Sequence, residues 1–472
     1  MQTKSECFML TYFPKYFSVR AIICYLVTLA LVSTFFISFV MPFQFMLFGL
    51  VPVIVFFDYS NKLTMKWQRI KPATFTKKLF TTALIIRIVY VIFIYFYYIE
   101  MTGLPHMYGV GDELFYLGFG SVWKLYGFDR LVYEVNSFDL SDRGYIIWLN
   151  VLSKVFGTHV LIARIVKCVI DAFSCVLIYN LAKRNFGEAT GRMSGIFWML
   201  IFNAWYYCGI SLKETEMMFL VVLFVERADF ALRSKHITIN GLALPAIIVL
   251  VMFTFRTALG AVLVAALVAA LILSSGRQLE LWKKIMFSMV FAIWMFMTVG
   301  VEMLEETQIL WEGRAENQSV GYEWRAETNS FAKYATASVF APLIFTIPFS
   351  SMVATLGQEN QMMFNGANFI KNIMSGLTIL AVFLLIVRGD WRKHVLPMAV
   401  MMGYLVVLVF SNFAHSERFH FPVLALEYMF AAFGVTQLTN KHKRWYVIWL
   451  IGICIANIAW AYIKLVGRGY SV

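Results

Sequence analysis

Long apolar runs alternate with short polar segments along almost the whole chain. A run of about 20 apolar residues is long enough to cross a bilayer as an α-helix. We place such runs at residues 19–40, 43–57, 79–100, 159–182, 190–209, 215–233, 240–255, 257–275, 285–302, 371–388, 395–412, 420–438 and 445–465. The pattern therefore predicts an all-α fold, a polytopic bundle of about thirteen transmembrane helices.

The composition agrees with a membrane protein. The chain has 472 residues, of which 60% are hydrophobic and 14% are charged, and this excludes a soluble domain of its size. The net charge of +13 does not indicate nucleic acid, because the Lys and Arg residues lie in short loops as topology signals. Cys24, Cys168, Cys175 and Cys454 fall within apolar runs, so we expect no disulfide framework. The first apolar run is expected to be retained as a span, since no small-residue cleavage site follows it.

Basic and acidic loops alternate along the chain. Segments 58–78, 276–284 and 388–394 are rich in Lys and Arg, whereas 101–158 and 302–337 collect acidic residues. Because basic loops stay in the cytoplasm, the first group is predicted inside and the second outside. The N-terminus is then inside and the C-terminus outside.

The apolar segment 338–357 is interrupted by Pro342 and Pro348. Counting it as a span would reverse every later loop, so we predict an interfacial or re-entrant segment on the outer face. The chain then divides into an N-terminal two-span hairpin with its basic loop (1–78), a transmembrane module with outer loop 101–158 (79–300), an outer loop with the re-entrant segment (301–370) and C-terminal spans (371–472).

The first outer loop carries the most distinctive polar motif, in which Asp112 and Glu113 follow Gly111. They could be two solvated loop acids. However, the segments after them, Leu114 to Leu125 and Tyr145 to Phe156, are amphipathic and predict interfacial helices at the headgroup level. Paired carboxylates at such a place suggest chemistry at a lipid surface.

The next outer loop is short and places Lys213, Glu214 and Glu216 on the same side as Asp112. The simpler interpretation is a tight turn with a capping box from Ser211 to Glu214. A loop with such a capped turn could still be functional.

Three charges share one face of a predicted span, because Arg164, Lys167 and Asp171 are spaced i, i+3 and i+7. Charges within a bilayer should face the bundle interior. The sequence leaves two roles open for these charges: an internal ion pair between Lys167 and Asp171, or the binding of phosphate. Arg87, in the middle of its span, is interpreted as structural.

Two later outer loops add cations. Arg256 closes a short turn, and Arg418 opens a late apolar helix after His415. A phosphate clamp by Arg418 is favoured over a metal site that would use His415 and His420, since these histidines lack clear ligand spacing.

In order and sidedness these motifs resemble the GT-C superfamily of integral-membrane glycosyltransferases, most of all bacterial relatives of protein O-mannosyltransferases and aminoarabinose lipid A transferases. The resemblance covers most of the chain from about residue 79, and the two spans before residue 60 are an addition to the usual pattern. Its motifs are the arginine-bearing span of Arg87, the pattern Asp112-Glu113-x-x-Tyr116, the segment from Tyr145 to Gly157 leading to Arg164, the loop Lys213-Glu214, and the pattern Arg418-Phe419-x-x-Pro422.

The resemblance implies inverting transfer of a sugar from a polyprenyl-phosphate donor to a lipid, glycan or protein acceptor, with 79–300 as the catalytic module. The site would face the periplasm from a bacterial inner membrane. Asp112 would be the general base, with Glu113 and Glu214 as further catalytic acids. The donor phosphate would be bound by Lys213, Arg256, Arg418, Arg164 and Lys167, and the substrates by Tyr116, Glu216 and His415. A divalent cation, Mg or Mn, is an alternative charge source, with Asp112, Glu113 and Glu214 as candidate ligands.

Two other functions remain open from the sequence. An O-antigen polymerase or ligase would use a polyprenyl-diphosphate glycan and outer-loop arginines such as Arg314 and Arg325. A flippase or transporter of lipid-linked sugars would need polar residues at mid-membrane and a repeat between halves, and the sequence shows no such repeat.

Overall fold

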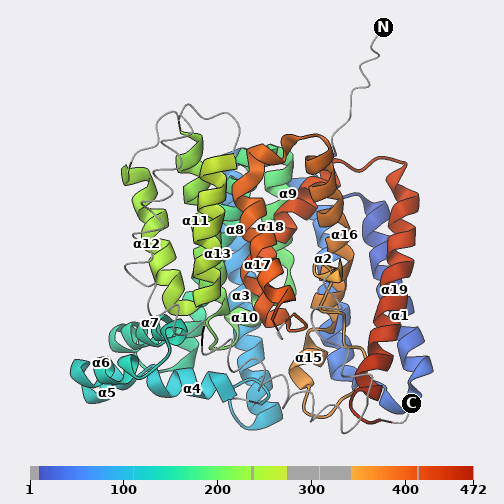
Figure 1. Cartoon of the computed structure of the whole chain (residues 1–472). Coiled ribbons are helices and arrows are strands. Elements are labelled where there is room, and N and C mark those ends of the chain that lie inside the picture. Colours follow the sequence, from blue (N-terminus) through green and yellow to red (C-terminus); the bar gives the residue numbers. More distant parts are fainter. Residues whose placement is uncertain are drawn as a thin grey trace.

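The structure, a computed structural model, describes residues 10–109, 111–234, 239–273, 308, 342–411 and 414–470. Within these ranges the regular secondary structure is helical (Figure 1). Seven helical segments are long and apolar enough to cross a membrane. They are α1 (Lys15–Phe35), α2 (Phe43–Trp67), α3 (Pro72–Thr102), α16 (Asn365–Val387), η4 (Asp390–His394) with α17 (Val395–Val409), α18 (Glu417–Thr436) and α19 (His442–Val466).

The remaining helices complete the bundle and a layer at one end of it. The bundle contains α8 (Val160–Phe186), α9 (Glu188–Leu200), α10 (Phe202–Cys208), α11 (Glu214–Arg233), α12 (Ile239–Phe255) and α13 (Thr257–Leu273). The shorter elements are η1 (Ile37–Phe39), α4 (Gly111–Phe119), α5 (Val122–Tyr126), α6 (Phe128–Asn136), α7 (Leu140–Phe156) and α15 (Glu359–Met363). Helices α4 to α7 lie together at the lower end of Figure 1.

Each predicted span overlaps a described helix, except 285–302, which lies outside the described residues together with the acidic loop 302–337. The predicted span 190–209 is interrupted, because Ile201 adopts an extended backbone (ψ 130°) that ends α9 before α10 begins. The helical membrane fold is therefore confirmed at this coarse level, while the number of spans stays a prediction.

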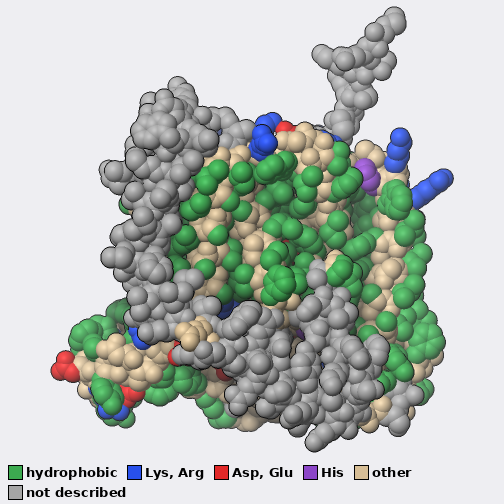
Figure 2. Space-filling model, in the orientation of Figure 1, with side chains coloured by type: hydrophobic (Ala, Val, Ile, Leu, Met, Phe, Trp, Pro, Cys, Tyr) green, Lys and Arg blue, Asp and Glu red, His purple; other side chains and the backbone are tan. Residues whose placement is uncertain are grey.

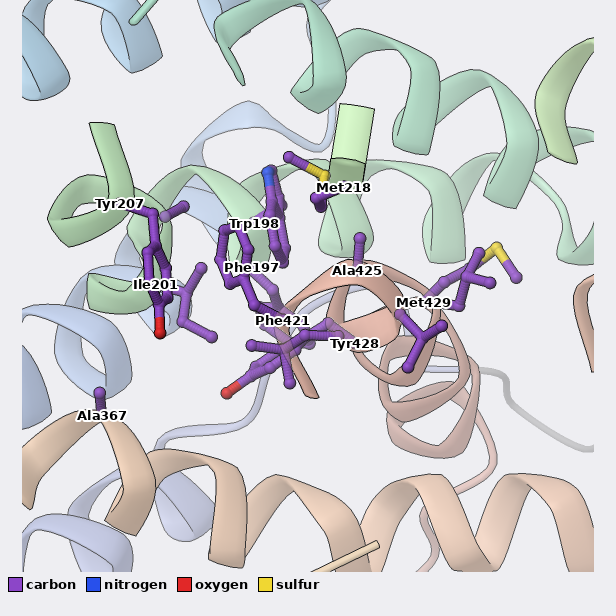
Figure 3. Close-up of a cluster of buried hydrophobic side chains, with 14 of the residues drawn as sticks. Phe197, Trp198, Ile201, Tyr207, Met218, Ala367, Phe421, Ala425, Tyr428 and Met429 are labelled. Carbon is purple, nitrogen blue, oxygen red and sulfur yellow. The ribbon is translucent and has the colours of Figure 1, made fainter. Parts of the chain in front are cut away.

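The centre of the bundle is formed by helices that are buried on nearly all sides. Nearly all of α9, α10 and α18 is buried, including the polar side chains of Arg192, His420 and Glu427. The aromatic rings of Trp198 and Tyr207 lie 5.6 and 4.5 Å from the ring of Phe421. Figure 3 shows α9, α10, α11, α16 and α18 meeting through Phe197, Trp198, Ile201, Tyr207, Met218, Ala367, Phe421, Ala425, Tyr428 and Met429.

Close backbone contact joins the N-terminal hairpin to this core. A Cβ atom on Gly366 of α16 would lie 2.2 Å from the backbone oxygen of Gly49 in α2, so only glycine fits there. Small residues allow this approach between helices in a membrane, where packing rather than water exclusion holds them together.

The basic loops gather at one end of the bundle. Arg184 of α8 pairs with Glu226 and Asp229 of α11. Arg233 at the end of α11 donates to the backbone oxygen of Lys393 at 2.7 Å. Figure 2 shows Lys and Arg at this upper edge and hydrophobic side chains over the middle of the helices. Helices α4 to α7 and α15 lie at the opposite end (Figure 1), and which end faces the cytoplasm stays a prediction.

The described part of segment 338–357 runs as irregular backbone between α16 and α19. The Lys371 Nζ donates to the Ile347 backbone oxygen at 2.6 Å, and Asn372 donates to the Pro348 oxygen at 2.9 Å. The Ser350 N–H donates to Asn457 of α19 at 2.7 Å. Non-helical backbone is tolerated inside a membrane protein where other protein groups satisfy it in this way.

A fully buried ion pair links α3 to α8. The Arg87 guanidinium pairs with the Asp171 carboxylate, which also accepts a hydrogen bond from the Trp198 indole at 2.9 Å. The proposed pair between Lys167 and Asp171 is therefore wrong, because packing of α3 on α8 brings Arg87 to Asp171 instead. Arg87 also donates to the backbone oxygen of Trp198 at 3.2 Å, so it ties α3, α8 and α9 together.

Replacing Arg87 by Met is expected to lower the free energy of unfolding in detergent by about 3–5 kcal/mol, because Asp171 becomes an unpaired buried charge. The double variant R87M/D171L should recover most of that loss, since both charges are removed. The matched control is Lys62→Met, which breaks an exposed pair with Asp58 and should leave stability nearly unchanged, because exposed ion pairs contribute little. Equal effects of Arg87→Met and Lys62→Met would contradict the structural role of Arg87.

Candidate functional site

The candidate site lies where α4 meets the first turns of α11 and α18. Asp112 and Glu113 stand in the first turn of α4 rather than in a loop, which corrects the sequence-based expectation. A helix N-terminus carries partial positive charge and favours acids at this place. The two neighbours have different surroundings, because the side chain of Asp112 is 57% exposed and that of Glu113 is fully buried.

Arg418 connects the acids of two outer segments. Its guanidinium pairs with Asp112 through one terminal nitrogen and with Glu214 through Nε. The three residues come from the first turns of α18, α4 and α11. The second oxygen of Glu214, Oε2, is buried and has no hydrogen-bond partner among the described residues. One cation therefore sits between a partly exposed carboxylate and a buried one.

A second group of polar residues stands beside the first. The Asp142 Oδ1 accepts hydrogen bonds from the Lys213 Nζ and from the Tyr116 hydroxyl, both at 2.6 Å. Burial works to raise the pKa of Asp142, but the Lys213 ammonium and the Tyr116 hydroxyl hold it below its usual range. Burial lowers the pKa of Lys213, as does the charge of Arg256, while Asp142 opposes them.

Asp142 was not among the site residues expected from the sequence. It lies 30 residues after Asp112 with no motif around it, and only the folding of α7 against α4 brings it near Tyr116. Its position in the first turn of an amphipathic helix on the outer side was the one available signal.

Glu113 is the anchor of α4. Its carboxylate pairs with Arg164 of α8 at 2.8 Å and accepts hydrogen bonds from the N–H groups of Met107 and Ser211, at 3.0 and 2.7 Å. Burial alone would raise the pKa of Glu113, but the His106 ring, the Arg164 guanidinium and these two N–H groups lower it to about 2. Glu113 thus stays ionised and inaccessible, which suits a structural carboxylate.

The same contact replaces the capping box expected at the next loop. Helix α11 begins at Glu214 without a side-chain cap, and Ser211 instead gives its backbone N–H to Glu113. The capping box is therefore wrong, because the loop is tied to α4 rather than to its own helix.

Lys167 lies deeper, against the end of α10. Its Nζ donates to the backbone oxygens of Tyr207 and Ile210 at 3.3 and 2.8 Å, and also to that of Leu212. Glu216 lies 3.6 Å away. In this arrangement the Lys167 ammonium donates hydrogen bonds to carbonyl groups at a helix end, which have no partner within the helix. A phosphate-binding role for Lys167 or for the buried Arg164 stays a prediction.

Arg256 and His415 occupy other edges of the site. The Arg256 guanidinium lies 4.4 Å from the ring centre of Phe419 and donates to the Tyr404 hydroxyl at 3.0 Å. The His415 ring stacks on Trp460 of α19, with ring centres 5.3 Å apart. The structure therefore brings Arg256 near Lys213, whereas His415 packs toward α19.

The described residues contain no group of three or more His, Cys, Asp or Glu side chains that could hold a metal ion. Of the three candidate ligands, Glu113 faces Arg164, while Asp112 and Glu214 both engage Arg418. In this structure the carboxylates of Asp112 and Glu214 are both engaged by a guanidinium, and a divalent cation at this place stays a prediction.

No protein-family model matches this chain, and no curated protein matches it. Its function must therefore be argued from the site, where acids and cations from separate elements meet beside interfacial helices.

Replacing Glu113 by Gln is expected to lower the free energy of unfolding by about 3 kcal/mol at pH 7, the equivalent of a pKa depressed from 4.5 to about 2. The Glu113 contribution should be complete above pH 4.5 and should disappear as the pH falls through about 2. Unfolding in detergent followed by circular dichroism against pH measures both effects. Glu134→Gln, at a surface pair with Arg130, is the control, and a similar loss in the two variants would rule out this role for Glu113.

Proposed function

We propose that this chain is a GT-C-type glycosyltransferase that moves a sugar from a polyprenyl-phosphate donor to a hydroxyl acceptor, with inversion. The observation that carries the proposal is Arg418, shared by Asp112 and Glu214 at the bundle end where α4 to α7 lie. A carboxylate, a phosphate-binding cation and a lipid-facing platform are the three requirements of this reaction.

The electrostatics support a division of labour. Asp112 is the more exposed acid, so an acceptor hydroxyl can reach it, whereas Glu214 is fully buried and holds Arg418 in place. A phosphate that binds Arg418 competes with Asp112 for the guanidinium. The Asp112 carboxylate is then free to accept a hydrogen bond from the acceptor hydroxyl.

In this mechanism Asp112 removes the acceptor proton as the hydroxyl oxygen attacks the anomeric carbon. The bond from that carbon to the phosphate oxygen breaks with its electron pair, and the polyprenyl phosphate leaves. Arg418 and Lys213 stabilise the charge that develops on the leaving phosphate. Tyr116 and Asp142 position Lys213 through their shared hydrogen bonds.

The two alternatives make different demands on the structure. A polymerase or ligase that uses a diphosphate-linked glycan would employ the same cations, and its candidate arginines Arg314 and Arg325 lie outside the described residues. A transporter would use mid-membrane charges along its route, but the pair Arg87 and Asp171 is buried and mutually neutralised. The site at the bundle end therefore supports a transferase over a transporter, and the monophosphate donor is the form of the reaction that we propose.

Asp112→Asn should reduce sugar transfer by about 100- to 10,000-fold, the usual contribution of a general base. The substitution keeps the shape of the side chain and removes its proton affinity. Turnover of purified enzyme with a monophosphate-linked sugar donor, at saturating substrates, measures the effect. Asp129→Asn, at an exposed acid of α6, should retain activity; near-normal turnover in Asp112→Asn would move the base to Asp142, Glu214 or Glu216.

Arg418→Ala and Lys213→Ala should each weaken use of the lipid donor by about 1.5–3 kcal/mol, the range of a lost charge-assisted hydrogen bond. Arg418→Lys should restore little, because lysine cannot engage two partners as a planar guanidinium does. The ratio kcat/KM for the donor measures this loss, and Arg256→Ala is compared in the same assay. Full activity in both alanine variants would remove these residues from the phosphate site.

A further inference from the structure

A cavity of about 480 Å³ lies beside α4, on a different face from Asp112 and Tyr116. Its walls come from the end of α3, the turn before α4, the start of α5, one side of α7 and the first turn of α8. Leu117 of α4 and Gly120, which follows α4, both line the cavity. The contacts of Arg418 and Lys213 do not use this space, and His106 joins it to Glu113.

The lining contains both apolar and polar side chains. Leu149, Leu152 and Ile162 form an apolar wall, while Ser121 and Thr158 add hydroxyl groups. None of the described lining residues is acidic. A space of this kind suits a ligand with one apolar and one anionic or polar part.

Groups that favour an anion lie around Gly157 and His159. The Lys124 Nζ would lie 3.7 Å from a Cβ atom on Gly157, a lining residue. The Nδ1 of His159 accepts the Leu161 N–H at 3.3 Å, so the Nε2 of its neutral ring is the nitrogen that can donate. The N-terminus of α8, which follows His159, adds the partial positive charge of a helix dipole.

The place of the cavity indicates the source of the ligand. The helices next to it expose large apolar side chains, with Leu125, Tyr126 and Phe128 each more than half exposed, as expected for helices that lie in the membrane interface. A lipid is therefore the ligand that could reach this cavity from the membrane interface.

We propose that this cavity binds an anionic glycerophospholipid, with its phosphate near Lys124 and His159 and the upper part of an acyl chain against Leu149, Leu152 and Ile162. The bound lipid would also stabilise the position of α4. His106 lines the cavity, and its Nδ1 lies 3.7 Å from the Glu113 Oε1. A filled cavity therefore fixes the segment that carries Asp112, while the binding itself does not depend on the proposed sugar transfer.

The test uses the full-length protein in nanodiscs and in detergent, without sugar donor or acceptor. Binding is followed by native mass spectrometry and by thermal stability, with phosphatidylglycerol, zwitterionic phosphatidylcholine and inorganic phosphate as separate probes. Phosphatidylglycerol should bind at least about 10-fold more tightly than phosphatidylcholine, a difference of about 1.4 kcal/mol. Inorganic phosphate should give no comparable stabilisation, because it lacks the acyl chain.

The double variant K124Q/H159Q should lower binding of phosphatidylglycerol to the level of phosphatidylcholine. Ala163→Trp, at a small lining residue, should fill the cavity and abolish binding of both lipids. Lys154→Gln is the matched control, since this exposed lysine of α7 lies over Trp123 and does not line the cavity. The proposal is overturned by equal binding of the two lipids to the unmodified protein, by unchanged preference in K124Q/H159Q, or by stabilisation with inorganic phosphate equal to that with lipid.

Because no sugar substrate is present, a failure of sugar transfer leaves these binding results unaffected. Conversely, an enzyme that transfers sugar but shows no preference for anionic lipid would retain the proposed function and lose this site.

Discussion

The structure depends on one constraint: the charges that α8 carries into the bundle must be neutralised by protein, because a bilayer offers no water. A single charge in this setting costs about 2.5–3.5 kcal/mol on insertion scales. Arg164 meets Glu113 of α4, Lys167 meets backbone carbonyls after α10, and Asp171 meets Arg87 of α3. Each partner belongs to a different element, so neutralising one helix determines how its neighbours assemble.

The position of the candidate site follows from this constraint. The pair between Glu113 and Arg164 fixes the rotation of α4 about its own axis. Asp112, the residue before Glu113, is thereby turned toward Arg418. The hydrogen bond from Ser211 to Glu113 likewise holds the loop that precedes Glu214. The polar contacts of the site are thus placed by buried neighbours that take no direct part in the proposed chemistry.

Hydrophobic runs predicted the helices well, since burial within lipid leaves a signal about 20 residues long. The expected gathering of basic loops at one bundle end also agrees with the contacts of Arg184 and Arg233. Ion-pair partners were not predictable, because spacing along α8 gives the shared face but not which helix packs there. Asp171 therefore pairs with a residue 84 positions away instead of with Lys167. Asp142 could be named from the sequence only as one of several outer-loop acids, since only tertiary packing joins it to Lys213.

Both cations of the candidate site are already paired with carboxylates, and this pairing determines how a phosphate donor could bind. Arg418 and Lys213 are both bound to carboxylates, so a phosphate can engage them only by taking over part of that pairing. The Asp112 carboxylate, once freed from Arg418, can accept a hydrogen bond from an acceptor hydroxyl. Donor binding and release of Asp112 then become a single exchange of partners, in which the proposed base is available only when the donor is in place.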